Sequence, residues 1–250
     1  MSPIVTHINY YLPKKNYSND KLKKNKSIDS IIKKVGINKK FSAEDNEYAS
    51  DLAVKAVRKL IDDFPDLRKS IDFLILCTQS PDYILPSSSS KIQNEIFSDK
   101  NIGSLDISLG CSGFVYSLAV AQSFIRSGFS KKILIVTCDT YSKFINDNDL
   151  SVRSIFGDAA VATIVSSTKK KNYRNFLPDF GTDGSGIYDL ILPGSGLQSI
   201  EKINNEAISK GVNKKFIENQ LSMDGTKMFT FALKAVPKTI NKVLKKNNVK

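Results

Sequence analysis

The sequence predicts a layered α/β fold, and three observations favour it. Short apolar runs of strand length alternate along the chain with longer segments of helical periodicity. Two of these runs, at 73–77 (FLILC) and 133–136 (ILIV), are continuously apolar, which is typical of strands covered on both faces in a parallel sheet. A third stretch, at 105–128, joins a strand to a helix through a cysteine flanked by glycines. Alternating strands and helices with buried strands indicate a layered α/β domain.

The first elements follow from pattern and capping residues. Residues 4–12 alternate as a strand does, and a lysine-rich segment at 14–40 follows, with a helical pattern at 28–35. Ser42 is expected to cap the next helix, with Asp45 three residues on in the manner of a capping box. The buried stripe of that helix is predicted to be Tyr48, Ala49, Leu52, Ala53, Ala56, Val57, Leu60 and Ile61.

The middle of the chain supplies the remaining strands. A loop with two prolines after residue 77 leads through four serines to a short helix around Ile92 and Phe97. The strand at 133–136 is followed by a polar, irregular segment at 146–154. Residues 159–165 are then predicted to form a further strand.

The lysine run at 169–171 marks the predicted domain boundary, so that residues 1–168 form one half and 169–250 begin another. In the second part we expect a strand at 187–192 and a polar surface insertion at 198–220. A final helix is predicted at 224–246. Its apolar stripe consists of Phe229, Ala232, Leu233, Val236, Ile240, Val243 and Leu244.

Composition limits the class of protein. Of the 250 residues, 41% are hydrophobic and 25% charged, as in globular proteins. No window holds the 18 or so apolar residues of a membrane span, and the amino terminus lacks the pattern of a signal peptide. The three cysteines are odd in number and widely spaced, which argues against a disulfide framework or a metal site. They fit a reducing cytoplasm.

The net charge of +12 comes almost entirely from lysines scattered in pairs and triplets. A nucleic-acid surface is not indicated, because no cluster of arginines with interleaved aromatic residues occurs. Two interpretations remain. The first is a compositional bias toward lysine, to which we assign most of the charge. The second is attraction of an acidic partner or a phosphate-bearing cofactor.

Cys111 lies where the central strand meets its helix, in the sequence LGCSGF. The first turn of a helix offers unpaired backbone N–H groups and the positive end of the macrodipole, which favour a thiolate and a developing oxyanion. Gly110 and Gly113 allow a tight turn and a close approach of substrate. Free cysteine is also among the residues most often buried in cores. The local sequence therefore leaves two roles open, nucleophile and core residue, at the start of a helix predicted to be buried nearly all round.

Several motifs carry a resemblance to a known family. They are, in chain order, ILCTQSPDYILPS, IQNEIF, DISLGCSGFVYSLAVAQSFIRSG, ILIVTCDTYS, IFGDAAVATIV, GTDGSG and MDGTKMFTFALKAVP. With these motifs the chain resembles the β-ketoacyl-acyl-carrier-protein synthase III family of thiolase-like condensing enzymes, over nearly all of its length. The resemblance implies a thiolase-like layered α/β/α/β/α fold, and it favours Cys111 as a nucleophile.

The resemblance also implies an activity. In that family the cysteine takes an acyl group from acyl-coenzyme A, and a carbanion from decarboxylating malonyl carrier protein then attacks the acyl-enzyme. Leu85 matches a position that reaches across a homodimer into the partner's acyl pocket, and Phe156 matches one that lines the pocket. The implied partners are acyl carrier protein and a second copy of the chain, with no metal and no resident cofactor. The acyl chain length and the pathway stay open.

The coenzyme site departs from the family pattern. Typical members carry a tryptophan and an arginine where this chain has Ser30 and Lys34, and a further arginine where it has Leu150. Lys34 still attracts phosphate as a point charge, but lysine does not stack as arginine does. The acyl donor is therefore expected to be either a carrier protein or coenzyme A held in a different way.

A second departure concerns condensation. The family's catalytic histidine and asparagine lie beyond the helix at 224–246, and the single histidine here, His7, matches neither. We therefore expect the amino-terminal portion of a longer enzyme, with a complete first half, an incomplete second half and no condensing activity. The alternative is a non-catalytic homologue or fragment that acts as a binding or dimerisation partner, and acylation of Cys111 separates the two. A hydrolase is disfavoured because GCSG does not fit G-x-S-x-G.

Overall fold

The computed structural model describes residues 2–22, 33, 36–169 and 177–249. The chain divides into two compact units, each built from separate stretches of sequence. The first consists of Met1–Tyr17, Lys40–Thr140 and Gly157–Phe176, and the second of Ser18–Lys39, Tyr141–Phe156 and Leu177–Lys250.

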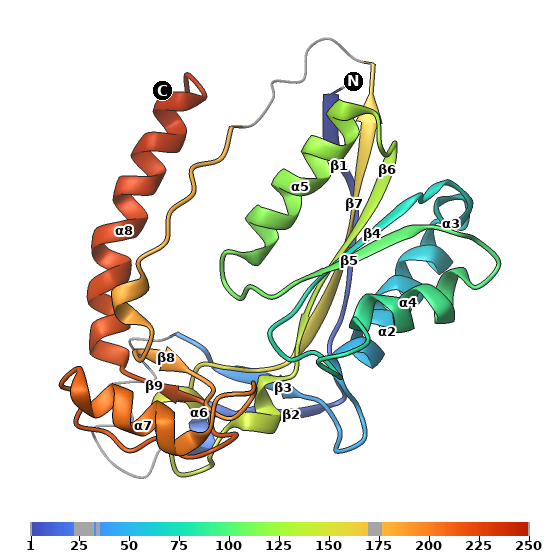
Figure 1. Ribbon diagram of the computed structural model, residues 1–250. Coiled ribbons are helices and arrows are strands. Elements are labelled where there is room, and N and C mark those ends of the chain that lie inside the picture. Colours follow the sequence, from blue (N-terminus) through green and yellow to red (C-terminus); the bar gives the residue numbers. More distant parts are fainter. Residues whose placement is uncertain (1, 23–32, 34–35, 170–176, 250) are drawn as a thin grey trace. The chain divides into compact units, whose positions relative to one another are not determined.

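A five-stranded sheet forms the centre of the first unit (Figure 1). Its order is β1 (Ser2–Tyr11), β7 (Ala159–Thr168), β6 (Lys132–Asp139), β4 (Phe73–Cys77) and β5 (Gly103–Ile107). The last three strands are parallel to one another, whereas β7 runs antiparallel to both β1 and β6. All five predicted strands are confirmed, with β5 ending before the cysteine-bearing turn.

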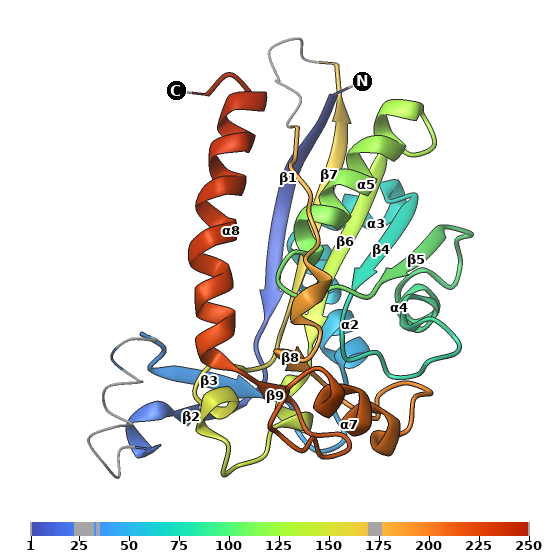
Figure 2. The same ribbon diagram turned by 60° about the vertical axis from the view of Figure 1, so that its left-hand side comes forward.

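Helices cover both faces of this sheet, which explains the continuous apolar run of β4 (Figures 1 and 2). Leu74 and Leu76 pack in the cluster that includes α2 (Ala49–Asp63), α3 (Asp66–Ser70) and α4 (Ser88–Phe97). Ile75 points to the opposite face and packs with α5 (Gly113–Ser127). All three side chains are fully buried, and such burial stabilises by about 1.5–3 kcal/mol per side chain.

The predicted cap of α2 is wrong. Ser42 is the last residue of β3 (Lys39–Ser42), a short strand that pairs with β2 (Lys15–Ser18). The backbone there is held extended by a distant residue, because the N–H of Ala43 donates to the Asp158 carboxylate at 2.8 Å. The helix instead begins after Tyr48, whose N–H donates to the Asp51 carboxylate at 2.9 Å.

The predicted stripe of α2 is largely confirmed. Its six interior members are buried, Ile61 is half-buried, and Tyr48 is exposed at the start of the helix. The interior members are Ala49, Leu52, Ala53, Ala56, Val57 and Leu60.

The helix α5 is less buried than its composition predicts. One stripe faces the sheet, consisting of Gly113, Ser117, Ala121, Gln122 and Ile125. Phe114 and Val115 on its other side are 37% and 39% exposed. The expectation of burial nearly all round is therefore wrong for this chain, because only one face of the helix packs on β-strands. The predicted end is confirmed at Gly128, which has a φ of 83°.

The second unit has a small core of its own. The helix α7 (Ile200–Ser209) packs through Ile203 and Ala207 against Phe216. The segment at 198–220, predicted to be a surface insertion, therefore supplies the core of this unit. The strand predicted at 187–192 shortens to β8 (Leu190–Ile191), which pairs with β9 (Ser222–Met223).

Two further elements of this unit are short. The segment predicted to be irregular at 146–154 contains α6 (Leu150–Arg153), and a 3-10 turn, η2 (Tyr141–Phe144), precedes it. Two other such turns are η1 (Asn19–Leu22) and η3 (Gly184–Gly186).

The long helix α8 (Gly225–Lys246) agrees with the prediction. Asp224 caps it by accepting the N–H of Lys227 at 3.0 Å. All of its residues are described, and none of them is buried. Pro237 lies within the helix. Its apolar stripe is exposed at Phe229, Leu233, Val236, Ile240 and Leu244.

Two expectations from the sequence remain, a helix at 28–35 and the lack of a membrane-spanning helix. The helical segment predicted at 28–35, with Ser30 and Lys34, lies outside the described residues except for Lys33. Along the described parts of the chain, no helix has both the length and the apolar character needed to cross a bilayer.

Candidate active site

Cys111 lies in a tight turn between β5 and α5. The N–H of Gly113 donates to the carbonyl of Gly110 at 2.8 Å and so closes the turn around Cys111 and Ser112. Ser112 is the residue before the helix, and its carbonyl accepts from Val115 and Tyr116. The strand-to-helix joint predicted from the sequence is therefore confirmed, and Cys111 is exposed at it.

The start of α5 carries the positive end of its helix dipole close to Cys111. This helix is described over its whole length, and its first turn contains no acidic side chain. The Ser112 side chain makes no capping bond to it in the described chain. A negative charge at this end is stabilised, typically by 0.3–1 kcal/mol at an exposed site. The turn therefore suits a sulfur or oxygen atom that becomes negative during reaction.

The other two thiols differ from Cys111 in their surroundings. Cys77 ends β4 and Cys138 lies near the end of β6, and both are buried. Burial raises the pKa of the Cys77 thiol, and it raises that of Cys138 far more. All three cysteines are among the described residues, and Cys111 is the exposed one. Of the three sulfur atoms, that of Cys111 is therefore the most accessible to solvent.

The Cys77 side chain contacts the turn that carries Cys111. Its Sγ donates to the carbonyl oxygen of Leu109 at 3.1 Å. A Cβ placed on Gly113 would lie only 2.2 Å from the same sulfur. A side chain at the first position of α5 would therefore overlap the Cys77 sulfur, and glycine leaves that space to it.

The loop that carries Leu85 is anchored at its base by Asp139. One oxygen of this half-buried carboxylate accepts the N–H of Gln79 at 2.7 Å, the N–H of Ser80 at 3.1 Å and the Thr78 hydroxyl at 3.1 Å. Burial is the largest influence on Asp139 and raises its pKa. The tip of the loop is exposed, with Leu85 at 86%.

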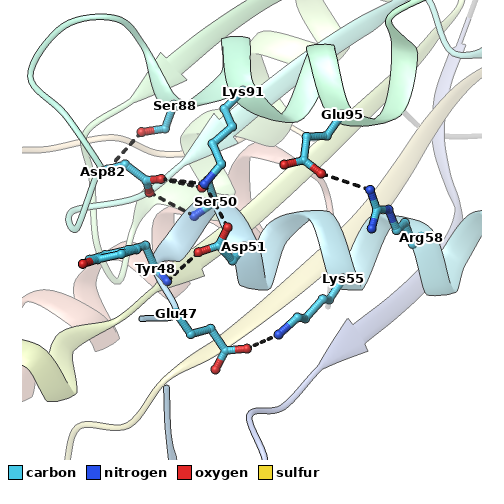
Figure 3. Close-up of polar contacts among 10 residues, drawn as sticks. All are labelled: Glu47, Tyr48, Ser50, Asp51, Lys55, Arg58, Asp82, Ser88, Lys91 and Glu95. Atoms are coloured by element: carbon cyan, nitrogen blue, oxygen red, sulfur yellow. Dashed lines mark hydrogen bonds and ion pairs between the residues drawn. The ribbon is translucent and has the colours of Figure 1, made fainter. Parts of the chain in front are cut away.

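A second carboxylate ties the same loop to the helices α2 and α4 (Figure 3). Asp82 accepts from the N–H of Ser50 at 3.2 Å and from Lys91 at 3.3 Å. Lys91 also bonds Asp51 at 2.8 Å. The Asp82 N–H in turn donates to the Ser88 hydroxyl at 3.1 Å.

The first turn of α4 is held by Asp106 of β5. Its two carboxylate oxygens accept the N–H groups of Ser88 and Ser89, at 2.8 and 3.0 Å. Sequence analysis did not find Asp82, Asp106 and Asp139 as anchors. The available signal was an aspartate at a strand end or in a proline-containing loop, where unpaired N–H groups need acceptors.

The remaining predicted residues lie elsewhere. Phe156 belongs to the second unit, is half-buried, and packs its ring at 5.2 Å from that of Tyr141. His7 lies on β1, where its ring meets that of Phe64 edge-on, with the ring centroids 4.5 Å apart. Lys34 is outside the described residues. Within the described ranges no group of three or more His, Cys, Asp or Glu side chains is arranged to hold a metal ion.

Comparisons with known proteins identify relatives of this chain. The family model for 3-oxoacyl-[acyl-carrier-protein (ACP)] synthase III matches residues 105–184, which include the Cys111 turn and β6 and β7. A β-ketoacyl-[acyl-carrier-protein] synthase III of Sulfurovum sp. is 34% identical over 244 residues, covering 97% of this chain and 69% of the relative. The chain belongs to this synthase III family. The corresponding protein of Clostridium tetani is 34% identical, with 96% and 71% covered.

Solved structures of the family have the same fold. A 2.1 Å crystal structure of a 3-oxoacyl-(acyl-carrier-protein) synthase III matches with a TM-score of 0.88 and 31% identity, over 100% of this chain and 75% of the other. The synthase from Burkholderia xenovorans LB400 gives 0.85 and 29%, over 100% and 70%. The predicted thiolase-like α/β fold is confirmed. A putative 3-oxoacyl-[acyl-carrier-protein] synthase 3 of Campylobacter jejuni is 31% identical, and the chain spans 63% of its length.

Proposed function

We propose that this chain carries the acyl-accepting site of a synthase III type acyltransferase, with Cys111 as its nucleophile. The Cys111 sulfur attacks the carbonyl carbon of an acyl thioester, and the donor thiol leaves. The observation that carries the proposal is the exposed Cys111 in a closed turn at the positive end of α5. The N-terminal end of a helix stabilises both the thiolate before attack and the oxyanion during it.

The second step follows from the family. A malonyl group on a carrier protein loses CO2, its carbanion attacks the acyl carbon, and the Cys111 sulfur leaves as a thiolate. Storing the acyl group on Cys111 divides one difficult reaction into two easier ones. The product is a β-ketoacyl carrier protein, which serves fatty-acid or related acyl biosynthesis.

Other residues have proposed roles in binding the acyl group or its donor. Leu85, exposed at the tip of its anchored loop, is proposed to enter the acyl pocket of a second copy in a homodimer. Phe156 is proposed to line an acyl pocket, and Lys34 to attract phosphate of the donor. The donor is acyl-coenzyme A or an acyl carrier protein, and carrier protein is also the partner in condensation. The three free thiols are consistent with a cytoplasmic setting.

The two halves of the chain are proposed to differ in their share of the chemistry. Residues 1–168 supply the nucleophile, and residues 169–250 belong to the second half of the fold. Residues 1–250 contain one histidine, His7, which packs on Phe64. We infer that this polypeptide alone accepts an acyl group without condensing it. Condensation needs hydrogen-bond donors to the oxygen that becomes negative during decarboxylation. Removal of one such donor typically costs on the order of 100- to 1000-fold in rate.

The test supplies acyl-coenzyme A and acyl carrier protein loaded with an acyl group, separately, to residues 1–250 and measures intact mass. One acyl adduct is expected on the wild type and none on Cys111→Ala. The control variant Cys138→Ala removes a buried thiol and is expected to keep the adduct. An adduct that persists in Cys111→Ala would overturn the proposed nucleophile. No adduct from either donor would favour a non-catalytic binding partner.

Malonyl carrier protein is then added to the acylated wild type. The expected result is an acyl adduct that remains on the protein. Release of a β-ketoacyl product by residues 1–250 would show that another side chain supplies the condensing step.

A further inference from the structure

The backbone that carries Cys111 is supported by one side chain of the neighbouring strand. Strands β4 and β5 pair in parallel, with Cys77 opposite Ile107. One residue further, the N–H of Thr78 donates to the Ile107 carbonyl at 3.1 Å. The register of this pair therefore places the Cys77 side chain beneath the chain that leaves β5.

The first contact of Cys77 is with the residue before the turn. Its thiol, a weak donor, donates to the Leu109 carbonyl, with the sulfur and oxygen 3.1 Å apart. The thiol is a donor only while it keeps its proton. Burial raises the pKa of Cys77, so the proton is retained at neutral pH.

The second contact is with the residue after the turn. Gly113 is buried, and its missing side chain leaves the space that the Cys77 sulfur fills, 2.2 Å from an ideal Cβ. The carbonyl of Gly113 also accepts the Ser117 hydroxyl at 2.8 Å. The same sulfur therefore contacts both ends of the segment at 109–113, and Cys111 lies between them.

We propose that Cys77 is a positioning residue for Cys111: its thiol fixes Leu109 and Gly113 and so sets where the nucleophilic sulfur lies. This inference depends on the proposed function of Cys111. Cys77 contacts no substrate and takes no part in bond making. It acts through the turn, and the cost of losing it appears in the rate of acyl transfer.

Position matters because the reacting atoms must meet at about 3–3.5 Å, and a displacement of about 1 Å can cost on the order of 100-fold in rate. Cys77→Ala removes the bond to Leu109 and the contact with Gly113 together. We expect acyl transfer to Cys111 at saturating donor to fall about 10-fold or more. Cys77→Ser keeps a donor for the Leu109 carbonyl and is expected to recover most of the rate.

Cys138 provides a matched control. It is also a buried cysteine near the carboxyl end of a parallel strand, but its side chain packs on the opposite face, with α2. Cys138→Ala therefore removes a comparable sulfur from the core without touching the Cys111 turn. It is expected to lower the thermal midpoint as Cys77→Ala does, and to leave acyl transfer unchanged.

The experiment measures acyl transfer to Cys111 for the wild type and the three variants, at saturating and low donor, with the thermal midpoint of each. Iodoacetamide labelling of Cys111, mapped by mass spectrometry, is followed in parallel. Slower transfer at saturating donor in Cys77→Ala, with recovery in Cys77→Ser, supports the proposal. A wild-type rate in Cys77→Ala overturns it, and so does an equal loss of rate in Cys138→Ala.

The outcome also separates this inference from the proposed function. If the wild type accepts no acyl group, the proposed function fails, and the iodoacetamide rate of Cys111 still tests the role of Cys77. Equal iodoacetamide rates in the wild type and Cys77→Ala would then overturn the positioning role.

Discussion

Replacing Gly113 by alanine tests the contact beneath the Cys111 turn in a way that yields a number. The new methyl would lie 2.2 Å from the Cys77 sulfur and 3.3 Å from the Cβ of Leu109. Overpacking of this kind costs about 1–3 kcal/mol. If the sulfur moves aside it also loses its bond to Leu109, worth about 1 kcal/mol. We therefore expect Gly113→Ala to destabilise the chain by about 2–4 kcal/mol.

A compensating change makes the prediction specific. Cys77→Ala alone removes one buried heavy atom and one hydrogen bond, a loss of about 2 kcal/mol. In the double variant the methyl introduced at position 113 lies 3.9 Å from the Cβ of residue 77, which is an ordinary contact, and keeps its closer approach of 3.3 Å to the Cβ of Leu109. The double variant should therefore be about as stable as Cys77→Ala alone. The two changes are coupled by about 2–4 kcal/mol in the favourable direction.

The assay is thermal unfolding of the wild type, both single variants and the double variant. For a chain of this length 1 kcal/mol corresponds to about 2–4 °C in the midpoint. Gly113→Ala should thus unfold about 5–15 °C below the wild type. A midpoint equal to that of the wild type, or a double variant that loses the sum of both single effects, would refute the contact between residues 77 and 113.

Three further predictions concern the loop that carries Leu85 and its anchors. Lys91→Ala removes the cation that pairs with the Asp82 carboxylate, whose side chain is 5% exposed. Thermal unfolding should therefore report a loss of about 3 kcal/mol in the free energy of unfolding. A loss below about 1 kcal/mol would contradict the ion pair of Figure 3. Burial raises the pKa of Asp139, so the folded chain binds a proton there more tightly than the unfolded chain does, and stability falls as pH rises through the interval above 3.8. A pH series of midpoints should show this fall in the wild type and lack it in Asp139→Asn; identical profiles would be evidence against a half-buried carboxyl that titrates with a raised pKa. Leu85→Ala, at an 86% exposed position, should change the stability of the single chain by no more than about 0.5 kcal/mol. It should shift acyl-length preference in a condensing dimer, and an unchanged preference would mean that Leu85 serves its own subunit.

The strands of the first unit could be predicted because their signal is local. The run at 73–77 faces helices on both sides, so every position selects an apolar residue, and the observed strand has the predicted bounds. The joint at Cys111 could be predicted for a similar reason. Gly110 and Gly113 flank the cysteine, and the apolar pattern changes period between the strand and the helix.

Other features depend on residues far apart in the sequence. Ser42 has the sequence signature of a helix cap, but Asp158 binds the neighbouring backbone and keeps it extended. Asp139 holds a turn about 60 residues away, and Cys77 meets a glycine that only the β4–β5 register brings to it. No local pattern contains such pairings.

Burial was the property that sequence periodicity described least well. The helices α5 and α8 were located correctly, yet only one face of α5 is buried and no residue of α8 is. Periodicity indicates which side of a helix is apolar, but not what packs against it. The pocket roles of Leu85 and Phe156 likewise depend on neighbours that the sequence pattern does not specify, and they stay predictions.

The most direct test of the central claim is competition for the thiols at neutral pH. Iodoacetamide is added to the folded chain, with and without prior exposure to an acyl thioester, and the modified cysteines are mapped by mass spectrometry. Cys111 is exposed whereas Cys77 and Cys138 are buried, so Cys111 should react first, and prior acylation should block it. Labelling of Cys77 or Cys138 ahead of Cys111, or a Cys111 that the thioester does not protect, would contradict Cys111 as the acyl-accepting nucleophile.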